Sequence, residues 1–401
     1  MSTNKKNLSL PKANKQRVLK QVMELMAIPG KSCHEGKVVA TLKEKILAAG
    51  IPQSAIKIDS VHKRAPSGGE VGSLIVKLPG TYQAPRRLMM AHCDTVPLCV
   101  GCRPVRKGDY IVSKDANTAL GADDRAGVSV LLHALLEIVR HKLPHPPLTF
   151  FFVVQEEIGL VGAHYVNKKL LGNPAFCFNW DGVSPQTTTI GATGNYEMTI
   201  KIKGIASHAG AYPERGVNAI AIAGLAIADL VKNGWHGLIV KGKQKGTSNI
   251  GYVNAGEATN VVTPDLLLLA QARSHQPTFR KRIVREYEKA FTKAVKQVKN
   301  DTGQTGKVEF DSELKYESFC LKKSEPVVKV AEAAISAVNL TPETAISNGG
   351  LDANWMTQHG FPTVTIGCGQ QNIHTVNERL HIEDYLNACR IGLILATGTE
   401  S

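Results

Sequence analysis

The sequence predicts an α/β fold with a smaller α+β domain inserted into it, and three observations support this prediction. Short apolar runs alternate with helical patterns in the first part of the chain, which is typical of parallel strands flanked by helices. From about residue 189 the pattern changes to half-exposed strands and amphipathic helices, and after residue 317 the first pattern resumes. We therefore expect a discontinuous domain of residues 1–188 and 318–401 around an insertion of residues 189–317.

The elements of the discontinuous domain follow from the spacing of their apolar residues. A helix is expected over residues 13–27 and another over 126–142, because apolar side chains recur there at helical intervals. Short apolar runs predict buried strands at 72–78, 86–94, 148–157 and 174–182. After the insertion, the same signals predict a helix over 324–339, a strand over 363–369 and a final helix over 381–398. The alternation of strands and helices predicts a parallel sheet.

Within the insertion, the sequence pattern predicts the order strand, helix, two strands, helix, strand. The expected elements lie at 196–205, 216–233, 247–254, 264–274, 279–299 and 307–319. This order is that of a ferredoxin-like unit, with a small antiparallel sheet covered on one face by helices. The second helix is rich in Lys and Arg, and the whole chain has a net charge of +14. A solvated helix face is the favoured interpretation of this helix, against a nucleic-acid-binding surface.

The composition is that of an ordinary globular chain. Its 401 residues are 43% apolar, which is enough for a sizeable core and suggests two or three domains. No apolar run approaches the roughly 18 residues that a membrane span needs, so we expect no membrane partner. The Lys-rich start lacks the apolar segment of a secretory signal, and the eight scattered cysteines suggest free thiols, so a cytoplasmic protein is expected. Cys99 and Cys102 lack the second ligand pair of a structural zinc site.

Polar residues of the metal-ligand type stand at the carboxyl ends of four predicted strands. These residues are His92, Asp94, Glu156, Glu157, Asp181 and His374. Ligands of open α/β sheets bind outside the carboxyl ends of the strands. Each residue alone is explained as a turn or cap residue, but several buried carboxylates together would repel one another unless a cation neutralised them. The joint pattern therefore predicts a site for zinc or a similar cation.

Sequence spacing suggests different roles within this set. His92 and Asp94 share one face of a strand, so that Asp94 can orient a ligating imidazole. Glu156 and Glu157 are adjacent and are expected to point in opposite directions, one toward the metal and one toward a water as general base. Asp123 and its neighbour Asp124 precede a helix, where capping is one interpretation and a carboxylate shared by two metals is the other for Asp123.

Together these motifs resemble the peptidase T-like branch of the di-zinc metallopeptidase family that also contains glutamate carboxypeptidase, succinyl-diaminopimelate desuccinylase and aminoacylase. The resemblance extends from PGKSCHEG to the end of the chain and rests on AHCDTVP, GADDRAG, QEEIGLVGA, NWDG, GIASHAGAYPERGVNAI, ARSH, NGGLDANW and NIHTVNE. It implies a zinc-peptidase-like central sheet with parallel strands flanked by helices. It also implies that the inserted domain acts as a lid and forms a homodimer.

The resemblance assigns roles to the candidate residues. It implies two zinc ions, although other divalent metals suit the same ligands, with His92 and Asp181 at one ion and Glu157 and His374 at the other. Asp123 would bridge both ions, ahead of a cis peptide bond to Asp124. Glu156 would be the general base and Asp94 the orienting partner of His92.

Further candidates lie outside this ligand set. The resemblance implies that His208 stabilises the oxyanion in the active site of a partner subunit, and a satisfied loop residue is the alternative. Five residues are candidates for substrate binding: Asn260, Arg273, Gly349, Gly350 and Asp352. Arg273 suits a substrate carboxylate, although a structural role is the alternative for both Arg273 and Asn260, and the two glycines would let a loop pass close to substrate. Asp352 would contact a substrate amine or cap the following helix.

The expected function is metal-dependent hydrolysis of peptide bonds, by an aminopeptidase that acts on short peptides such as tripeptides. An N-acyl amino acid deacylase or a carboxypeptidase of the same family is the first alternative. A basic nucleic-acid-binding protein without catalysis is a remoter alternative, and the low aromatic content of 5% opposes it, so we expect no nucleic-acid partner. A catalytically inactive relative is opposed by the complete set of candidate ligands.

Overall fold

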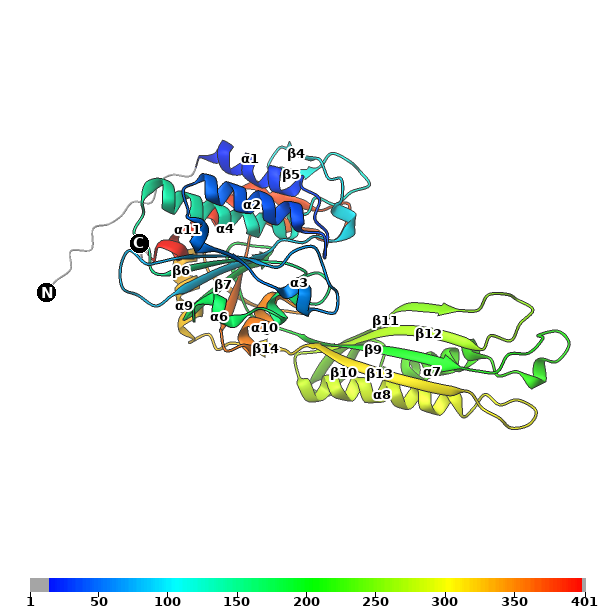
Figure 1. The fold of residues 1–401 in the computed structure, drawn as a ribbon. Helices are drawn as coiled ribbons and strands as arrows, with labels where there is room; N and C mark the ends of the chain where they lie inside the picture. The colour runs from blue at the N-terminus through cyan, green and yellow to red at the C-terminus, as the bar shows by residue number, and fades with distance from the viewer. Residues whose placement is uncertain (1–13, 399–401) are drawn as a thin grey trace. The chain divides into compact units, whose positions relative to one another are not determined.

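A computed structural model describes residues 14–398 of the chain, which form two units (Figure 1). Of the described residues, the first unit contains residues 14–191, 320–347 and 351–398. The second unit contains residues 192–319 and 348–350. The Lys-rich start of the sequence lies outside the described residues. The assignment of one unit to catalysis and of the other to a lid or a dimer contact stays a prediction, because the boundaries of a unit do not reveal its role.

The first unit is built on a nine-stranded mixed sheet. Its order is β1-β2-β6-β3-β7-β16-β8-β14, and β15 pairs with β8. The strands are β1 (Ile56–Ile58), β2 (Leu74–Leu78), β3 (Arg87–His92), β6 (Leu148–Val153), β7 (Phe176–Gly182), β8 (Thr187–Ala192), β14 (Phe319–Cys320), β15 (Glu343–Ser347) and β16 (Thr363–Gly367). The four central strands β6, β3, β7 and β16 are parallel to one another, so their carboxyl ends lie at the same edge.

The expectation of parallel strands is wrong for the run at 72–78. This run forms β2, which pairs antiparallel with β6. The connection from β2 to β3 spans only residues 79–86, whereas a parallel crossover needs about a dozen residues or more. At the other side of the central block, β8 pairs antiparallel with β16.

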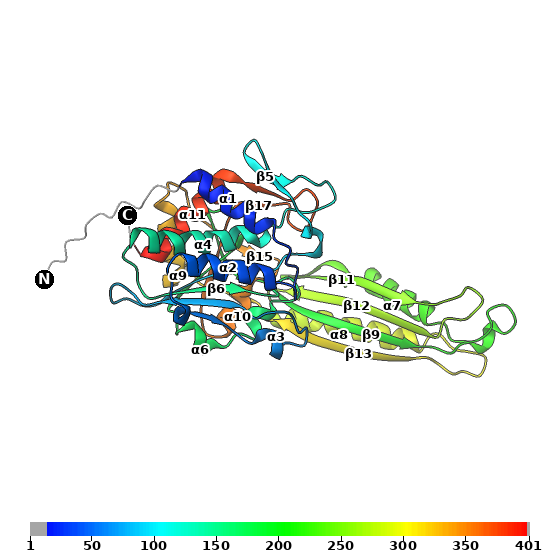
Figure 2. The same ribbon diagram turned by 45° about the horizontal axis from the view of Figure 1, so that its top comes forward.

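Helices cover both faces of this sheet (Figures 1 and 2). They are α1 (Lys15–Met26), α2 (Gly36–Ala48), α3 (Val61–Arg64), α4 (Ala122–His141), α5 (Val161–His164), α6 (Lys168–Leu171), α9 (Pro326–Ser336), α10 (Asp352–Gln358) and α11 (Ile382–Thr397). Helices α1, α2, α4 and α11 form the layer on one face, and α6 and α10 lie against the other. Helix α4 packs on β3 and β7 and also contacts α1 and α11, which explains why most of its residues are buried. A small antiparallel sheet of the order β17-β18-β5-β4 completes the unit, from the strands Gln370–Gln371, Arg379–His381, Tyr110–Ser113 and Pro104–Lys107.

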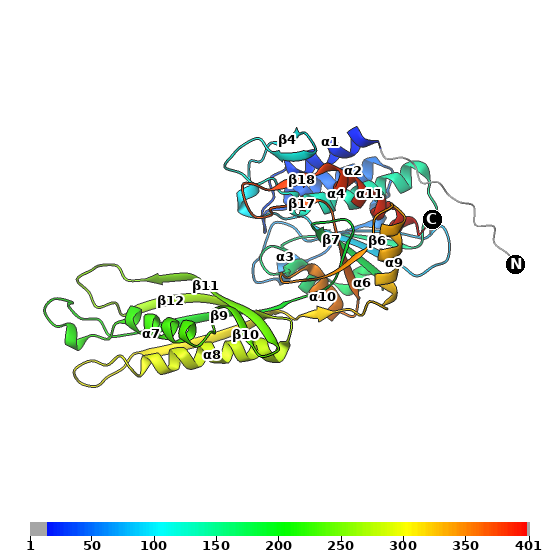
Figure 3. The same cartoon turned by 180° about the vertical axis from the view of Figure 1, so that it is seen from behind.

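The second unit is a five-stranded antiparallel sheet with two helices packed on one face (Figure 3). Its elements are β9 (Gly194–Lys203), α7 (Ala219–Lys232), β10 (Gly237–Lys241), β11 (Gln244–Ala255), β12 (Asp265–Ser274), α8 (Pro277–Val295) and β13 (Lys307–Tyr316). The sheet order β10-β11-β12-β9-β13 contains the ferredoxin-like order of four strands. Strand β10 was not predicted. It forms a hairpin with β11 through a two-residue loop, in which Gly242 takes a positive φ of 61°.

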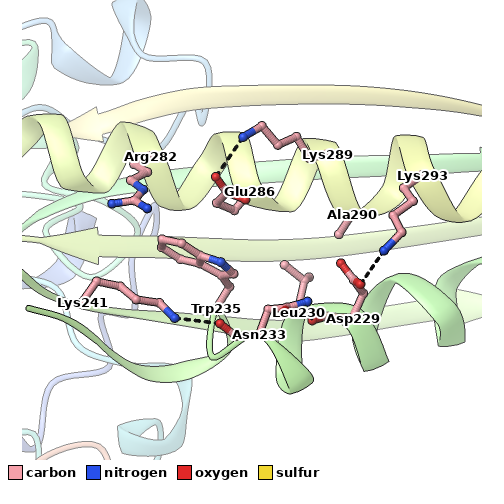
Figure 4. A pocket seen from close by; sticks show the side chains of 10 residues that line it. All are labelled: Asp229, Leu230, Asn233, Trp235, Lys241, Arg282, Glu286, Lys289, Ala290 and Lys293. Carbon is pink, nitrogen blue, oxygen red and sulfur yellow. Dashed lines mark hydrogen bonds and ion pairs between the residues drawn. The ribbon is translucent and has the colours of Figure 1, made fainter.

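Helices α7 and α8 border a pocket of about 500 Å³ (Figure 4). Lys289 and Lys293, which project from α8, pair with Glu286 and Asp229 at 3.0 and 2.9 Å. Apart from the buried Arg280, the basic side chains of α8 are exposed, as expected for a solvated helix face, and part of their charge is compensated. None of the predicted site residues lines this pocket. Within residues 14–398, no helix is long and apolar enough to cross a membrane.

Candidate metal centre

The carboxyl ends of the central parallel strands bring the predicted ligands together. His92 is the last residue of β3, Asp181 lies near the end of β7, and Glu157 follows β6. His374 lies between β17 and β18, after β16, and Asp123 lies near the start of α4. Five residues from five parts of the sequence therefore meet at one edge of the sheet.

These side chains form two groups of potential ligand atoms that share Asp123. His92, Asp123 and Asp181 form one group, and Asp123, Glu157 and His374 form the other, with all ligand atoms of a group within 4.8 Å of one another. The Nε2 atom of His92 lies 3.0 Å from Oδ1 of Asp123, and that of His374 lies 3.1 Å from Oδ2. The two oxygens of one carboxylate thus face different imidazoles, which is the arrangement expected of a bridging ligand.

The chemistry of the donor atoms fits two divalent cations. Imidazole nitrogens and carboxylate oxygens are the usual zinc ligands apart from thiolates. His374 Nε2 lies 3.0 Å from Glu157, and hydrogen bonds to Asp123 and Glu157 raise the pKa of His374 to about 10. Burial raises the pKa of the Asp181 carboxyl far above its usual value, and the charge of Asp123 adds to this effect. Cations would take the place of the imidazole protons and favour the ionised carboxylates.

The expected shared strand face of His92 and Asp94 is wrong, because β3 ends at His92, but the role of Asp94 as orienting partner of His92 stays a prediction. His92 Nδ1 lies 3.1 Å from the main-chain oxygen of Asp94 and 3.5 Å from its carboxylate. The main chain, rather than the carboxylate, is therefore the nearer partner of the imidazole. The carboxylate also accepts the N–H groups of Glu156 at 2.9 Å and Glu157 at 3.1 Å, and the hydroxyl of Ser32 at 2.7 Å. Asp94 thus connects the end of β3 to the segment that follows β6.

The expected alternation of Glu156 and Glu157 along a strand is also wrong, because β6 ends at Val153. Both residues lie beyond it, after Gln155, which has a positive φ of 59°. Glu157 is directed to His374, whereas Glu156 belongs to neither group of ligand atoms. Burial raises the pKa of Glu156 well above its usual value, and the charges of Asp181, Asp352 and Glu157 raise it further. The Glu156 carboxyl therefore lies beside the acidic cluster without belonging to the ligand groups.

Asp123 and Asp124 have different surroundings, and the peptide bond between them is cis. Asp123 faces the two imidazoles. Asp124 accepts the N–H groups of His92 at 3.2 Å and Gly127 at 3.1 Å, so it caps the start of α4 and fixes the end of β3. The capping interpretation thus holds for Asp124 only.

Sequence reasoning missed the buried Glu378. Its carboxylate accepts the N–H of Asp123 at 3.0 Å and that of Gly121 at 2.7 Å. Burial raises the pKa of Glu378 to about 7. Gln370 was also missed, and its side-chain amide donates to Asp181 at 3.3 Å. Glu378 lies four residues after His374 in NIHTVNE, but nothing in the local pattern shows that this Glu turns inward.

Most of the remaining candidates lie in the second unit and are described within it. The exposed His208 accepts the N–H groups of Gly210 and Ala211 at its Nδ1, at 3.2 and 3.0 Å. Backbone N–H groups only donate, so the ring proton of a neutral His208 stands on Nε2. Arg273 Nε donates to Gln271 at 3.1 Å, and the main-chain oxygen of Asn260 accepts the N–H of Ala209 at 2.9 Å.

The two candidate glycines also lie in the second unit. At Gly350 a Cβ atom would stand 2.4 Å from the ring of Tyr316, so the close approach that requires glycine there is to a side chain of this protein. Gly349 is the neighbouring residue of the same unit.

Asp352 lies in the first unit, at the first position of α10. The preceding residue, Leu351, is the N-cap, and its N–H donates to the side chain of Asn354 at 2.9 Å. The Asp352 side chain is only 1% exposed, and its Oδ1 has no hydrogen-bond partner within the described structure. Burial raises the pKa of Asp352 to about 7. The capping role suggested for Asp352 is therefore wrong.

The known proteins that resemble this chain are peptidases. The model of Peptidase family M20/M25/M40 matches residues 88–397. A tripeptidase from Staphylococcus aureus subsp. aureus Mu50 is 32% identical with a TM-score of 0.85, over 96% of this chain and 99% of that one. Aminopeptidase PepT from Bacillus cereus ATCC 10987 is 29% identical with a TM-score of 0.80, over the same shares of both chains. Peptidase T from Bacillus subtilis strain 168 is 24% identical over 74% of this chain and 69% of the relative.

We predict that two substitutions will separate the shared ligand from an unshared one. Asp123→Ala should lose both metal ions, because each group of ligand atoms would be left with two members. His374→Ala should lose mainly one ion and keep the other. Metal analysis of the purified proteins by mass spectrometry checks this expectation, and equal losses in both variants would contradict the shared role of Asp123.

We also predict that metal binding near pH 7 releases protons. In the metal-free protein His374 has a pKa of about 10 and is protonated at pH 7, whereas a ligating imidazole must be neutral. The release should therefore be present at pH 7 and decline as the pH rises through about 10. Calorimetric titration in buffers of different ionisation enthalpy measures the number of protons, and an absence of release at pH 7 would contradict the proposed ligand.

Proposed function

The chain belongs to Peptidase family M20/M25/M40 and is a metal-dependent peptidase, and we propose that it is an aminopeptidase that removes the first residue of short peptides such as tripeptides. The observation that carries this proposal is the pair of ligand groups sharing Asp123, with the buried carboxyl of Glu156 beside them. The similarity to a tripeptidase and to an aminopeptidase over nearly the whole chain supports the choice of substrate.

Glu156 is the proposed general base. Two cations held by His92, Asp123, Asp181, Glu157 and His374 would polarise the scissile carbonyl and lower the pKa of a water molecule. Glu156 would accept a proton from the attacking water and return it to the nitrogen of the leaving amine. Its raised pKa suits a group that must both accept and return a proton near neutral pH.

His208 is the proposed oxyanion donor, contributed by the partner subunit of a homodimer. Its Nδ1 already accepts two backbone N–H groups, so its Nε2–H is left as the donor. A donor of this kind, aimed at the oxygen that becomes negative in the transition state, contributes about 3–4 kcal/mol in comparable sites.

Asp352 is the proposed partner of the substrate's α-amine, which distinguishes an aminopeptidase from a deacylase or carboxypeptidase. Its carboxyl is buried, and one of its oxygens is unpartnered within the described structure. A buried carboxylate without a partner is costly, and a protonated amine would remove that cost. Arg273, Asn260, Gly349 and Gly350 remain candidates for contacts to the rest of the peptide.

We further propose zinc as the metal, a homodimer formed through the second unit, and a cytoplasmic location. Mixed imidazole and carboxylate ligands suit zinc. On the second unit, α7 exposes Ile220, Leu225 and Val231, and the edge strand β10 exposes Leu238 and Val240, so apolar side chains are available for a contact on this unit. All eight cysteines are free, as is usual in a reducing compartment.

A substrate panel tests the proposed function. We expect the protein loaded with zinc to release the first residue of a free tripeptide and to leave the same tripeptide with an acetylated amino group intact. The reason is that acetylation removes the positive charge that Asp352 is proposed to bind. Asp352→Asn should raise the KM for the free tripeptide at least tenfold. Cleavage of the acetylated peptide or of an N-acyl amino acid alone would decide for the deacylase or carboxypeptidase.

Glu156→Gln tests the general base. This variant should bind both metal ions, because Glu156 is in neither ligand group, yet lose about 10²- to 10⁴-fold in kcat because the proton acceptor is removed. Metal content and kcat are measured on the same preparation. A variant with both ions and nearly normal turnover would show that another group is the base.

A further inference from the structure

We propose that Glu35 is a positioning residue for Glu156, and this inference rests on the proposed function. Glu35 is fully buried, and its Oε1 accepts the N–H of Gln155 at 3.0 Å. Gln155 directly precedes Glu156. Glu35 lies in the segment PGKSCHEG, to which neither the ligand groups nor the mechanism has so far given a role.

Glu35 and Asp94 together hold three successive amides of the segment that carries the proposed base. Glu35 accepts the N–H of Gln155, and Asp94 accepts those of Glu156 and Glu157. The two carboxylates thus accept the successive amides of Gln155 and Glu156, and burial together with the charge of Asp94 raises the pKa of Glu35 to about 8. Two buried carboxylates side by side are electrostatically costly. Successive N–H groups that point into one concavity attract anions, and they offset part of this cost.

The local chain would not hold this conformation by itself. Gln155 has a φ of 59°, a left-handed conformation that non-glycine residues seldom adopt. Its side chain is fixed as well, since Oε1 accepts the hydroxyl of Ser67 at 2.6 Å and Nε2 donates to the main-chain oxygen of Gly68 at 2.8 Å. Contacts from two parts of the chain, Glu35 and residues 67–68, thus determine where Gln155 lies and, through it, the direction in which Glu156 leaves β6.

A helix cap is the simplest alternative role for Glu35, because this residue occupies the N-cap position of α2. Its side chain makes no capping hydrogen bond to that helix. Oε1 instead accepts the N–H of Cys33 at 3.1 Å in addition to that of Gln155. The neighbouring Ser32 donates its hydroxyl to Asp94 at 2.7 Å. The segment of residues 32–35 therefore attaches to the base-carrying segment through both carboxylates.

Loss of the Glu35 contact is expected to move Glu156 and to leave the metal ligands in place. Without Glu35, the N–H of Gln155 loses its acceptor, while Asp94 still holds the amides of Glu156 and Glu157. A shift of about 1 Å in a catalytic group can cost about 10²-fold in rate. We therefore expect a loss in kcat with both metal ions still bound and with KM unchanged.

Two substitutions of Glu35 distinguish positioning from charge. In Glu35→Gln the side-chain oxygen can still accept both N–H groups, so kcat should stay within about threefold of wild type. Glu35→Asp keeps the charge but is one methylene shorter and cannot reach Gln155, so kcat should fall about 10- to 100-fold with metal content and KM unchanged. The opposite order of the two variants would overturn the proposal.

Asp59 supplies a matched control. It is buried, its Oδ1 accepts the N–H groups of Val61 and Ser73 at 3.1 and 2.9 Å, and its Oδ2 has no partner in the described structure. Glu35 has the same pattern, with two N–H groups on one oxygen and none on the other. Asp59→Ala should lower the melting temperature but should not show the fall in kcat that is expected for Glu35→Asp. A similar fall in kcat in this control would show that destabilisation alone explains the effect.

Amide hydrogen exchange provides a readout that does not depend on activity. In the metal-free protein, the amides of Gln155, Glu156 and Glu157 should exchange faster in Glu35→Asp than in wild type, and at the wild-type rate in Glu35→Gln and Asp59→Ala. If the wild type hydrolysed no peptide, the proposed function would fail while this measurement still tested the contact.

Unchanged exchange in Glu35→Asp, or loss of metal ions with the loss of activity, would overturn the positioning role. Should Glu35→Asp fail to fold, a tenfold or greater fall in kcat in a fully metallated Glu35→Gln would overturn it as well.

Discussion

The accumulation of buried negative charge at the carboxyl edge of β6, β3, β7 and β16 is the constraint on which the rest of the structure depends. Parallel strands deliver their carboxyl ends to one edge, and here those ends carry acidic residues. Asp123, Asp181 and Glu157 lie within hydrogen-bonding or ligand distance of two imidazoles. In the absence of cations, burial and mutual repulsion raise the pKa of Asp181 and Glu157. Such an arrangement is stable in its ionised form only with cations present.

The acidic residues at this edge fall into two sets with different partners. The first set faces the imidazoles. The second set accepts backbone N–H groups of the segments that carry the first: Asp124 holds the amide of His92, Glu378 that of Asp123, and Asp94 that of Glu157. Three of the five candidate ligands therefore have their own main chain fixed by a buried carboxylate. Glu35 extends this arrangement to Gln155 and so to the segment of the proposed general base, Glu156.

The parts of the site that could be predicted from the sequence are those encoded in local patterns. Apolar runs that end in His92 or Asp181 are visible without knowledge of the fold, and the rule that ligands gather at the carboxyl ends of parallel strands places them together. The direction of β2 depends on the short connection to β3, and the direction of Glu157 depends on a hydrogen bond to Asp94 that is distant in sequence. Glu35 and Glu378 resemble ordinary surface glutamates until the fold buries them.

Two cations alone would not neutralise all the buried carboxylates of this site. Two divalent cations carry four positive charges, and the three ligand carboxylates cancel three of them. One positive charge is left to offset the other buried carboxylates at this edge, which are Glu35, Asp94, Asp124, Glu156, Asp352 and Glu378. Backbone amides supply the remaining compensation for Asp94 and Asp124, which accept two N–H groups each. Glu156 and Asp352 have no such amide partner in the described structure, and they are the residues proposed for proton transfer and for binding a cationic substrate group.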